Sequence, residues 1–176
     1  VEAGLGGSFD ATNVIEPPEV AIITPVSLEH TAILGSTPAE IARDKAGIIK
    51  AGTTAVVAPQ RDPAVVEVVR ARCAAVGAEL VDVGAAYEVV PGERHPWGQA
   101  FRLIGPKGER QMRTPMLGFH QLENAATAVA AAEALRSRGF ALSEQAIVDG
   151  VAFTRVPGRL EVMGQKPLIV ADGAHN

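Results

Sequence analysis

Three strand-like segments that alternate with helical patterns constrain the fold of this chain more than any other feature. They span residues 20–24, 53–58 and 79–83. A continuous apolar run such as residues 20–24 is typical of a strand buried on both faces of a parallel sheet. A capping box, Thr37-Pro38-Ala39-Glu40, predicts a helix that runs to about Lys50, and Asp62-Pro63 begins a second helix. The alternation predicts an α/β fold built on a parallel sheet.

The pattern changes after Gly84. Short strand-like segments, separated by turns rich in proline and glycine, predict a small antiparallel insert over residues 84–115. A long alanine-rich helix then follows Gly118, and a shorter helix begins at Ser143. The apolar residues 168–171 predict one more strand.

The composition narrows the class of protein. Hydrophobic residues make up 47% of the chain and aromatic residues 4%, which fits an α/β core of aliphatic side chains. A net charge of −4 gives no support for a nucleic-acid or membrane-surface partner. The single cysteine, Cys73, cannot form an internal disulfide and fits a reducing compartment, and its place on an apolar helix face predicts a core residue. We expect a cytoplasmic, monomeric enzyme.

A glycine-rich stretch near the start of the chain, residues 2–13, carries two carboxylates and short polar side chains. Three glycines within four residues allow the backbone to pass close to a ligand, and carboxylates suit a hard cation with its phosphates. A solvated surface turn is the plainer interpretation of the same residues. A dinucleotide fingerprint fits poorly, because the pattern that begins at Gly4 needs glycine at the position of Phe9.

Four further positions are candidates for a ligand site. His30 follows the apolar run 20–24, and ligands collect beyond the carboxyl ends of strands in open α/β sheets. Lys45 lies on the apolar stripe of the first helix, where most lysines extend along the stripe to water. His120 and Asn124 are one helical turn apart and can face one ligand, although an ordinary polar helix start has the same pattern.

Several motifs in register resemble those of the folylpolyglutamate and dihydrofolate synthases, members of the Mur ligase family. The glycine-rich stretch is similar to that family's signature, E-V-G-L-G-G-R-L-D-A-T-N. The other motifs are Leu28-Glu29-His30-Thr31, Asp44-Lys45-Ala46-Gly47-Ile48-Ile49-Lys50, Gly118-Phe119-His120-Gln121 with Asn124, Pro157-Gly158-Arg159-Leu160-Glu161 and Asp172-Gly173-Ala174-His175-Asn176. Ser8, Phe9 and Glu29 depart from the arginine, leucine and aspartate that are usual in the family.

The resemblance implies an ATP-dependent ligase that joins L-glutamate to a folate or dihydropteroate through an acyl phosphate, with ATP and Mg²⁺ as cofactors. The implied fold is a truncated Rossmann-like parallel sheet of the P-loop NTPase type, with helices on both faces. Glu2, His30 and Lys45 match metal-site positions, Lys45 as the family's carbamylated lysine, and His30 and Lys45 are also the implied catalytic residues. The positions that match the ATP-binding residues are His120, Gln121, Asn124, Arg159, Asp172 and His175.

The sequence contains no G-x-x-x-x-G-K-[ST] phosphate loop, and the resemblance places that loop upstream of the glycine-rich stretch. We therefore expect residues 1–172 to be a partial central ATP-binding domain, residues 173–176 to begin a hinge to a further domain, and the 176-residue chain alone to be inactive. A muramoyl-type ligase of the cell wall and a non-catalytic nucleotide-binding module are the alternatives. The folate-type motifs favour the folate ligase over the first.

Overall fold

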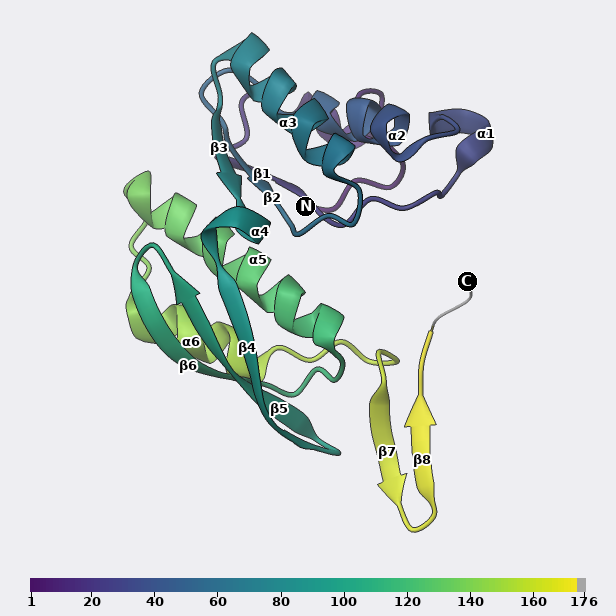
Figure 1. Cartoon of the computed structure of the whole chain (residues 1–176), viewed down its shortest axis with the longest axis vertical. Coiled ribbons are helices and arrows are strands. Elements are labelled where there is room, and N and C mark those ends of the chain that lie inside the picture. Colours follow the sequence, from purple (N-terminus) through teal and green to yellow (C-terminus); the bar gives the residue numbers. More distant parts are fainter. Residues whose placement is uncertain (174–176) are drawn as a thin grey trace. The chain divides into compact units, whose positions relative to one another are not determined.

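The structure, a computed structural model, describes residues 1–173, and it contains two compact units (Figure 1). Unit 1 consists of residues 1–85 and 133–140, and unit 2 contains residues 86–132 and the residues from 141 onward. Residues 174–176, which include His175 and all of the predicted hinge except Gly173, lie outside the described residues.

Unit 1 carries the parallel sheet. Its elements are η1 (Ala11–Val14), β1 (Val20–Ile23), α1 (Thr31–Leu34), α2 (Pro38–Lys45), η2 (Ala46–Ile48), β2 (Thr54–Val57), α3 (Pro63–Val76), β3 (Glu79–Asp82) and α4 (Val83–Ala86), whose last residue already belongs to unit 2. The strands are parallel in the order β1-β2-β3, which confirms the α/β fold predicted from their alternation with helices.

The core of unit 1 forms where α2 and α3 cover one face of this sheet. Ile41 of α2 and Val65, Val69 and Cys73 of α3 pack with sheet residues that include Ala21 and Val57. The capping box of α2 is present as predicted, with Thr37 Oγ1 accepting from Glu40 N at 3.2 Å. Asp62 likewise caps α3 by accepting from Ala64 N at 2.9 Å.

Two expectations for unit 1 are wrong in detail. Ile22 of β1 is 41% exposed, so β1 is not buried on both faces in the described residues. The helix of the capping box ends at Lys45 rather than at Lys50 and continues as the short 3₁₀ turn η2. The reason is that Asp44 O accepts from Ser8 N and Ser8 Oγ, and a continuing α-helix would need that oxygen for the amide four residues on.

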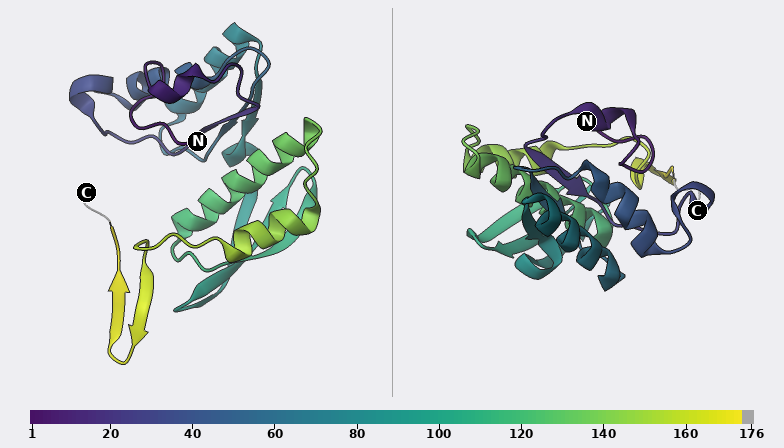
Figure 2. Two further views of the ribbon diagram at one scale, coloured as in Figure 1. Left: turned by 180° about the vertical axis from the view of Figure 1, so that it is seen from behind. Right: turned by 90° about the horizontal axis from the view of Figure 1, so that it is seen from above.

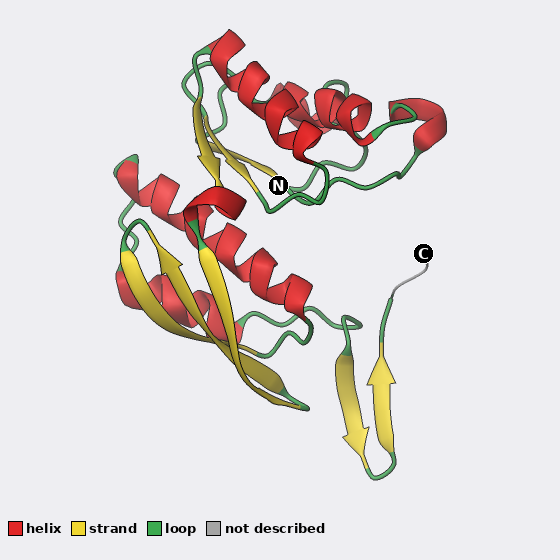
Figure 3. Ribbon diagram, viewed as in Figure 1, coloured by secondary structure: helices red, strands yellow, loops and turns green. Residues whose placement is uncertain are grey.

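Unit 2 carries an antiparallel sheet and two helices (Figure 3). Its elements are β4 (Glu88–His95), β5 (Gly98–Gly105), β6 (Gly108–Thr114), α5 (Phe119–Ser137), whose last turns belong to unit 1, α6 (Glu144–Phe153), β7 (Glu161–Gln165) and β8 (Leu168–Ala171). The strand order is β4-β5-β6, and both neighbouring pairs are antiparallel, as the sequence predicts. The strands have 8, 8 and 7 residues, which is longer than the short segments that the sequence predicts.

This sheet supports the two helices. The helices α5 and α6 lie against one face of it, as the view from behind in Figure 2 shows. Phe101, Leu103 and Met112 are buried on the sheet, and Ile147 is buried on α6. Arg110 of β6 forms an ion pair with Glu144 at the start of α6, which fixes that helix on the sheet. The predicted insert is therefore the platform of a helix pair.

A separate two-stranded hairpin, β7–β8, ends the described part of the chain. The strand over residues 168–171 is present as predicted, but its partner β7 is not anticipated from the sequence. The residues of β7 alternate between exposed and half-buried, but the apolar Met163 is 68% exposed and Gly164 on the half-buried side has no side chain, which explains why the sequence pattern is weak.

Candidate functional site

The glycine-rich stretch of unit 1 docks on the C-terminal end of α2. Gly7 N donates to Asp44 Oδ2 at 2.9 Å, and both Ser8 N and Ser8 Oγ donate to Asp44 O, at 3.1 and 2.9 Å. A Cβ atom on Gly7 would lie 2.6 Å from Lys45 O. The close backbone approach that glycine allows is thus made to α2, and it fixes the loop beside Lys45.

Asp10 folds the centre of this loop. Its Oδ2 accepts from Gly4 N at 2.9 Å and from Leu5 N at 3.0 Å, and its Oδ1 accepts from the hydroxyl and amide of Thr12 at 2.6 and 2.9 Å. The Thr12 hydroxyl and then the Leu5 amide are the main causes that lower the pKa of Asp10 from 3.8 to about 2. One ionised carboxylate therefore organises the turn that follows Glu2.

The three residues predicted for a metal site all lie in unit 1. Glu2 and His30 are exposed, and Lys45, the last residue of α2, is half-buried. His30 has a left-handed backbone, with φ of 49°, just before α1. Within residues 1–173, no group of three His, Cys, Asp or Glu side chains could hold a metal ion. The described chain alone therefore provides no complete metal cage.

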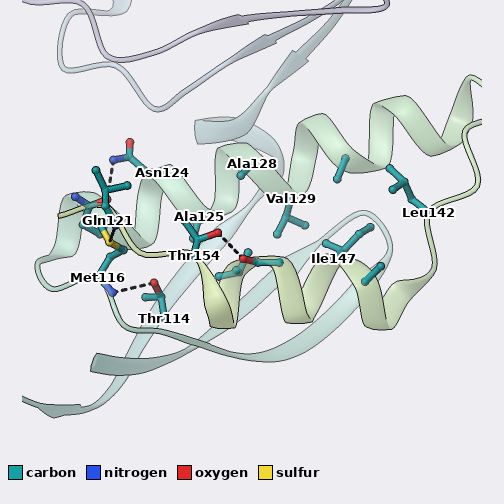
Figure 4. Close-up of a pocket in the computed structure, with 15 residues that line it drawn as sticks. Thr114, Met116, Gln121, Asn124, Ala125, Ala128, Val129, Leu142, Ile147 and Thr154 are labelled. Atoms are coloured by element: carbon teal, nitrogen blue, oxygen red, sulfur yellow. Dashed lines mark hydrogen bonds between the residues drawn. The ribbon is translucent and has the colours of Figure 1, made fainter. Parts of the chain in front are cut away.

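A cavity of about 390 Å³ lies between α5 and α6 in unit 2 (Figure 4). Ala125, Ala128 and Val129 form its wall on α5, and Ile147 and Thr154 belong to the α6 side. Thr114, the last residue of β6, and Met116, in the connection from β6 to α5, also line it. Apolar walls with a few polar groups at one end suit a flat, largely apolar ligand.

Two amides lie at the polar end of this cavity. Asn124 Nδ2 donates to Gln121 Oε1 at 3.1 Å, and both residues line the cavity. This bond leaves Asn124 Oδ1 as an acceptor and Gln121 Nε2 as a donor. A neighbouring acceptor and donor match the donor and acceptor on one edge of an adenine ring.

His120 lies apart from this arrangement. It is exposed and does not line the cavity, and its ring is beside Gly118, where a Cβ atom would meet His120 Cε1 at 2.6 Å. The structure thus brings Gln121 and Asn124 together at one cavity, while the pairing of His120 with Asn124 is not formed.

Two further predicted residues, Arg159 and Asp172, lie at the β7–β8 hairpin, and His175 falls outside the described residues. Asp172 Oδ2 accepts from Leu160 N at 2.8 Å, and Gly158 N donates to Glu161 Oε2 at 2.9 Å. These bonds hold a tight turn in which Arg159 is exposed. Asp172 thereby positions the turn that presents the Arg159 guanidinium.

Sequence reasoning misses two parts of these sites. Asp44, which receives the glycine-rich stretch, is not among the predicted site residues, because its acceptor role depends on residues 36 and 37 positions earlier. The α6 wall of the cavity is also missed. The small residues of α5 and Gly150 of α6 are the signal that could have shown two helices packing closely around a hollow.

Comparison with known proteins assigns the chain to a family. The family description "Mur ligase middle domain" matches residues 3–132. The chain belongs to the Mur ligase family. This middle-domain match includes the glycine-rich stretch from Ala3 onward, α2 with Lys45, and the Gln121–Asn124 pair.

Curated relatives extend the similarity over the whole chain of this Mur ligase domain. It is 38% identical to the folylpolyglutamate synthase of Lacticaseibacillus casei over 178 aligned positions, which cover 100% of the chain and 41% of that relative. It is also 38% identical to the dihydrofolate synthase/folylpolyglutamate synthase of Bacillus subtilis, with 99% of the chain and 41% of the relative covered. The chain thus spans about two-fifths of the length of these relatives.

Solved structures agree with the sequence comparison. An FPGS–AMPPCP–folate complex superposes with a TM-score of 0.92 at 37% identity, over 100% of this chain and 43% of that chain. The Mycobacterium tuberculosis folylpolyglutamate synthase complexed with ADP gives a TM-score of 0.88 at 39% identity, over 100% of this chain and 40% of that one. These matches confirm the α/β fold and the similarity to folylpolyglutamate synthases that the motifs indicate.

Proposed function

We propose that this domain is the nucleotide-binding part of an ATP-dependent amide ligase that adds L-glutamate to a folate or dihydropteroate through an acyl phosphate. The observation that carries the proposal is the 37% identity and 0.92 TM-score to the FPGS–AMPPCP–folate complex over the whole chain. The motif Asp10-Ala11-Thr12-Asn13 favours this activity over that of a muramoyl-type ligase, and it forms η1 and its cap.

The cavity between α5 and α6 supports adenine as its ligand in our proposal. Gln121 and Asn124 offer one donor and one acceptor, and the walls of Ala125, Val129 and Ile147 offer apolar faces to a purine ring. His120 lies outside the cavity. We propose that it acts near the nucleotide, and the matching motif is the only support for this role.

Magnesium is the proposed metal, and the donor set fits it. Glu2 and His30 are exposed donors, which suits an ion that keeps several waters and takes other ligands from phosphates. When bound, Mg²⁺ neutralises charge that gathers on phosphate oxygens. We propose that Lys45 also serves this site as a carbamate. The glycine-rich stretch, which includes Glu2, is docked on Asp44 and Lys45 and therefore lies beside Lys45.

Arg159 is proposed to bind ATP phosphate. Its guanidinium is always charged and presents a planar fork that matches phosphate oxygens. The turn that presents it is held by the Asp172 carboxylate at Leu160 N. Asp172 is therefore proposed to position Arg159, in addition to the role near the ATP ribose that its matching motif implies. We propose that His175 also binds ATP, because it belongs to a matching motif.

The test is ligase activity of the full-length protein. Purified protein with ATP, Mg²⁺ and L-glutamate should release phosphate and form a glutamylated product with dihydropteroate or a reduced folate. The same assay with a muramoyl substrate should give no product. Product from the muramoyl substrate alone would overturn the proposal.

Lys45 gives a sharper test of the chemistry. As a carbamate, Lys45→Ala should be nearly inactive and partly restored by acetate, and Lys45→Arg should also be inactive. Substantial activity in Lys45→Arg, with no effect of acetate on Lys45→Ala, would show that the ammonium group itself acts.

We also propose that the enzyme works as a monomer in the cytoplasm. No helix in residues 1–173 is long and apolar enough to span a membrane. Size-exclusion chromatography with light scattering would measure the oligomeric state, and fractionation of cells would locate the protein.

A further inference from the structure

A second hollow, of about 530 Å³, lies in unit 1 between the glycine-rich stretch, α2 and α3. Two arginines line it, Arg43 from α2 and Arg72 from α3. No aspartate or glutamate lines it, although the chain has 20 acidic and 16 basic residues. None of the residues proposed for the metal site lines it either, so it is a separate feature of the domain.

The two guanidinium groups are available to a ligand. Arg43 is exposed and has no hydrogen bond or ion pair to the residues that the structure describes. Arg72 is half-buried, and its Nε donates to Ile49 O at 3.1 Å. That bond fixes the plane of the Arg72 guanidinium, while its two terminal nitrogens make no contact with a protein acceptor within residues 1–173. The two terminal nitrogens of a guanidinium that is held in this way match the two oxygens of a carboxylate in bidentate geometry.

The rest of the lining suits a ligand with a short carbon chain. Val68 and Ala71 of α3 present methyl groups to the hollow. Ser8 and Asn13 add polar atoms from the glycine-rich stretch. Asn13 Nδ2 donates to Ser8 O at 3.0 Å, so the side-chain amide is held in place, and Asn13 Oδ1 has no hydrogen-bond partner within residues 1–173. An inorganic anion has no carbon atoms that could use the apolar wall.

We propose that this hollow binds a short aliphatic dicarboxylate, with Arg43 and Arg72 each receiving a carboxylate and Val68 and Ala71 contacting the methylene groups between them. The identity of that ligand rests on the function proposed above. Free L-glutamate and the γ-linked glutamate tail of an extended folate both have this chemistry. Loss of one bidentate contact lowers affinity by about 10-fold or more.

Protection of individual arginines from phenylglyoxal tests the site on the full-length protein, without ATP or Mg²⁺. Peptide mass spectrometry would measure the modification rates of Arg43 and Arg72, with Arg61 as the matched control, because Arg61 is an exposed arginine of unit 1 outside the hollow. The probes are L-glutamate, tri-γ-glutamate and inorganic phosphate at constant ionic strength. Either glutamate probe should slow the modification of Arg43 and Arg72 at least several-fold and leave Arg61 unchanged.

The comparison of probes identifies the source of the ligand. If tri-γ-glutamate protects more strongly than L-glutamate, the ligand is the glutamate tail of the folate. If L-glutamate protects equally well at the same or a lower concentration than tri-γ-glutamate, the ligand is the free amino acid. Calorimetry with the better probe should show at least a 10-fold loss of affinity at the protected site in Arg43→Gln and none in Arg61→Gln. Protection by phosphate alone, protection of all three arginines alike, or no protection would overturn the inference.

Ligase activity of the same preparation separates this inference from the proposed function. An active ligase without protection at Arg43 and Arg72 would refute the site and leave the function standing. Protection in a protein that forms no glutamylated product would refute the function and leave the dicarboxylate site.

Discussion

Replacement of Gly7 by alanine tests how the glycine-rich stretch is held. A Cβ atom at Gly7 would lie 2.6 Å from Lys45 O and 3.0 Å from Asp44 O. Both neighbours are backbone atoms of α2, which cannot rotate away as a flexible side chain could. The loop must therefore move off the helix, and its hydrogen bonds to Asp44 must lengthen or break.

The expected destabilisation has two parts. Overpacking by one methyl group costs about 1–3 kcal/mol. Gly7 N and the two donors of Ser8 make three bonds to Asp44, and the loss of one or two of them costs about 1 kcal/mol each. The sum is roughly 2–5 kcal/mol, a large part of the total stability of about 5–15 kcal/mol for a typical domain. Gly4→Ala is the matched control, since its nearest neighbour, Asp10 Oδ2, lies at an ordinary 3.5 Å.

The single cysteine supplies an assay that reports on unit 1 alone. Cys73 is 3% exposed in the core of that unit, so a short pulse of thiol reagent labels it only in unfolded molecules. With a urea m-value of about 1.5 kcal/mol/M, Gly7→Ala should move the labelling midpoint down by about 1–3 M. Gly4→Ala should move it by less than about 0.3 M. A midpoint for Gly7→Ala equal to that of Gly4→Ala would refute the packing argument.

Three further predictions concern unit 1. The pKa of Asp10 is lowered from 3.8 to about 2, so the stability that its carboxylate contributes is complete above pH 3.8 and is lost as the pH falls through about 2. Asp10→Asn should lower the thermal unfolding midpoint at pH 7 and reduce the decrease of that midpoint between pH 3.8 and about 2. An unchanged midpoint at pH 7 would contradict this. Thr37→Ala removes the side-chain acceptor for Glu40 N at 3.2 Å and should cost about 0.5–2 kcal/mol in urea unfolding, whereas a loss below about 0.3 kcal/mol would show that the cap is not formed in solution. Burial raises the pKa of the Cys73 thiol, so Ellman's reagent at pH 8 should react with the folded chain at least about 100-fold more slowly than with the chain in urea, and similar rates would show an open core.

The parts of the fold that could be predicted from the sequence depend on short-range chemistry. The starts of α2 and α3 follow from Thr37 and Asp62, because an N-cap bonds to an amide two or three residues on. The end of α2 could not be predicted, because it depends on Ser8, which lies 36 residues away in sequence. The partner strand β7 could not be predicted, because its exposed side carries the apolar Met163 and its half-buried side includes Gly164, so apolar and polar residues do not alternate in the sequence.

The candidate site divides in the same way. Gln121 and Asn124 are three residues apart on one helix, so local spacing places both at the cavity. The opposite wall comes from α6, which packs on β6 of the antiparallel sheet. His120 precedes the cavity by a single residue, yet the helical rotation of about 100° per residue turns it away from the lining residues.

Some contacts of unit 1 form only after a residue late in the chain has been synthesised. Arg138 forms an ion pair with Glu19, 119 residues earlier in the chain, and its Nη1 donates to Gly52 O at 2.8 Å. At a synthesis rate of about 5–20 residues per second, Glu19 waits roughly 6–24 s for this partner. All of unit 2 up to residue 132 is synthesised in that interval. The parallel sheet of the newborn chain is therefore left without its last contacts until the end of α5 has emerged, and a ribosome that stalls before Arg138 would carry an unfinished unit 1.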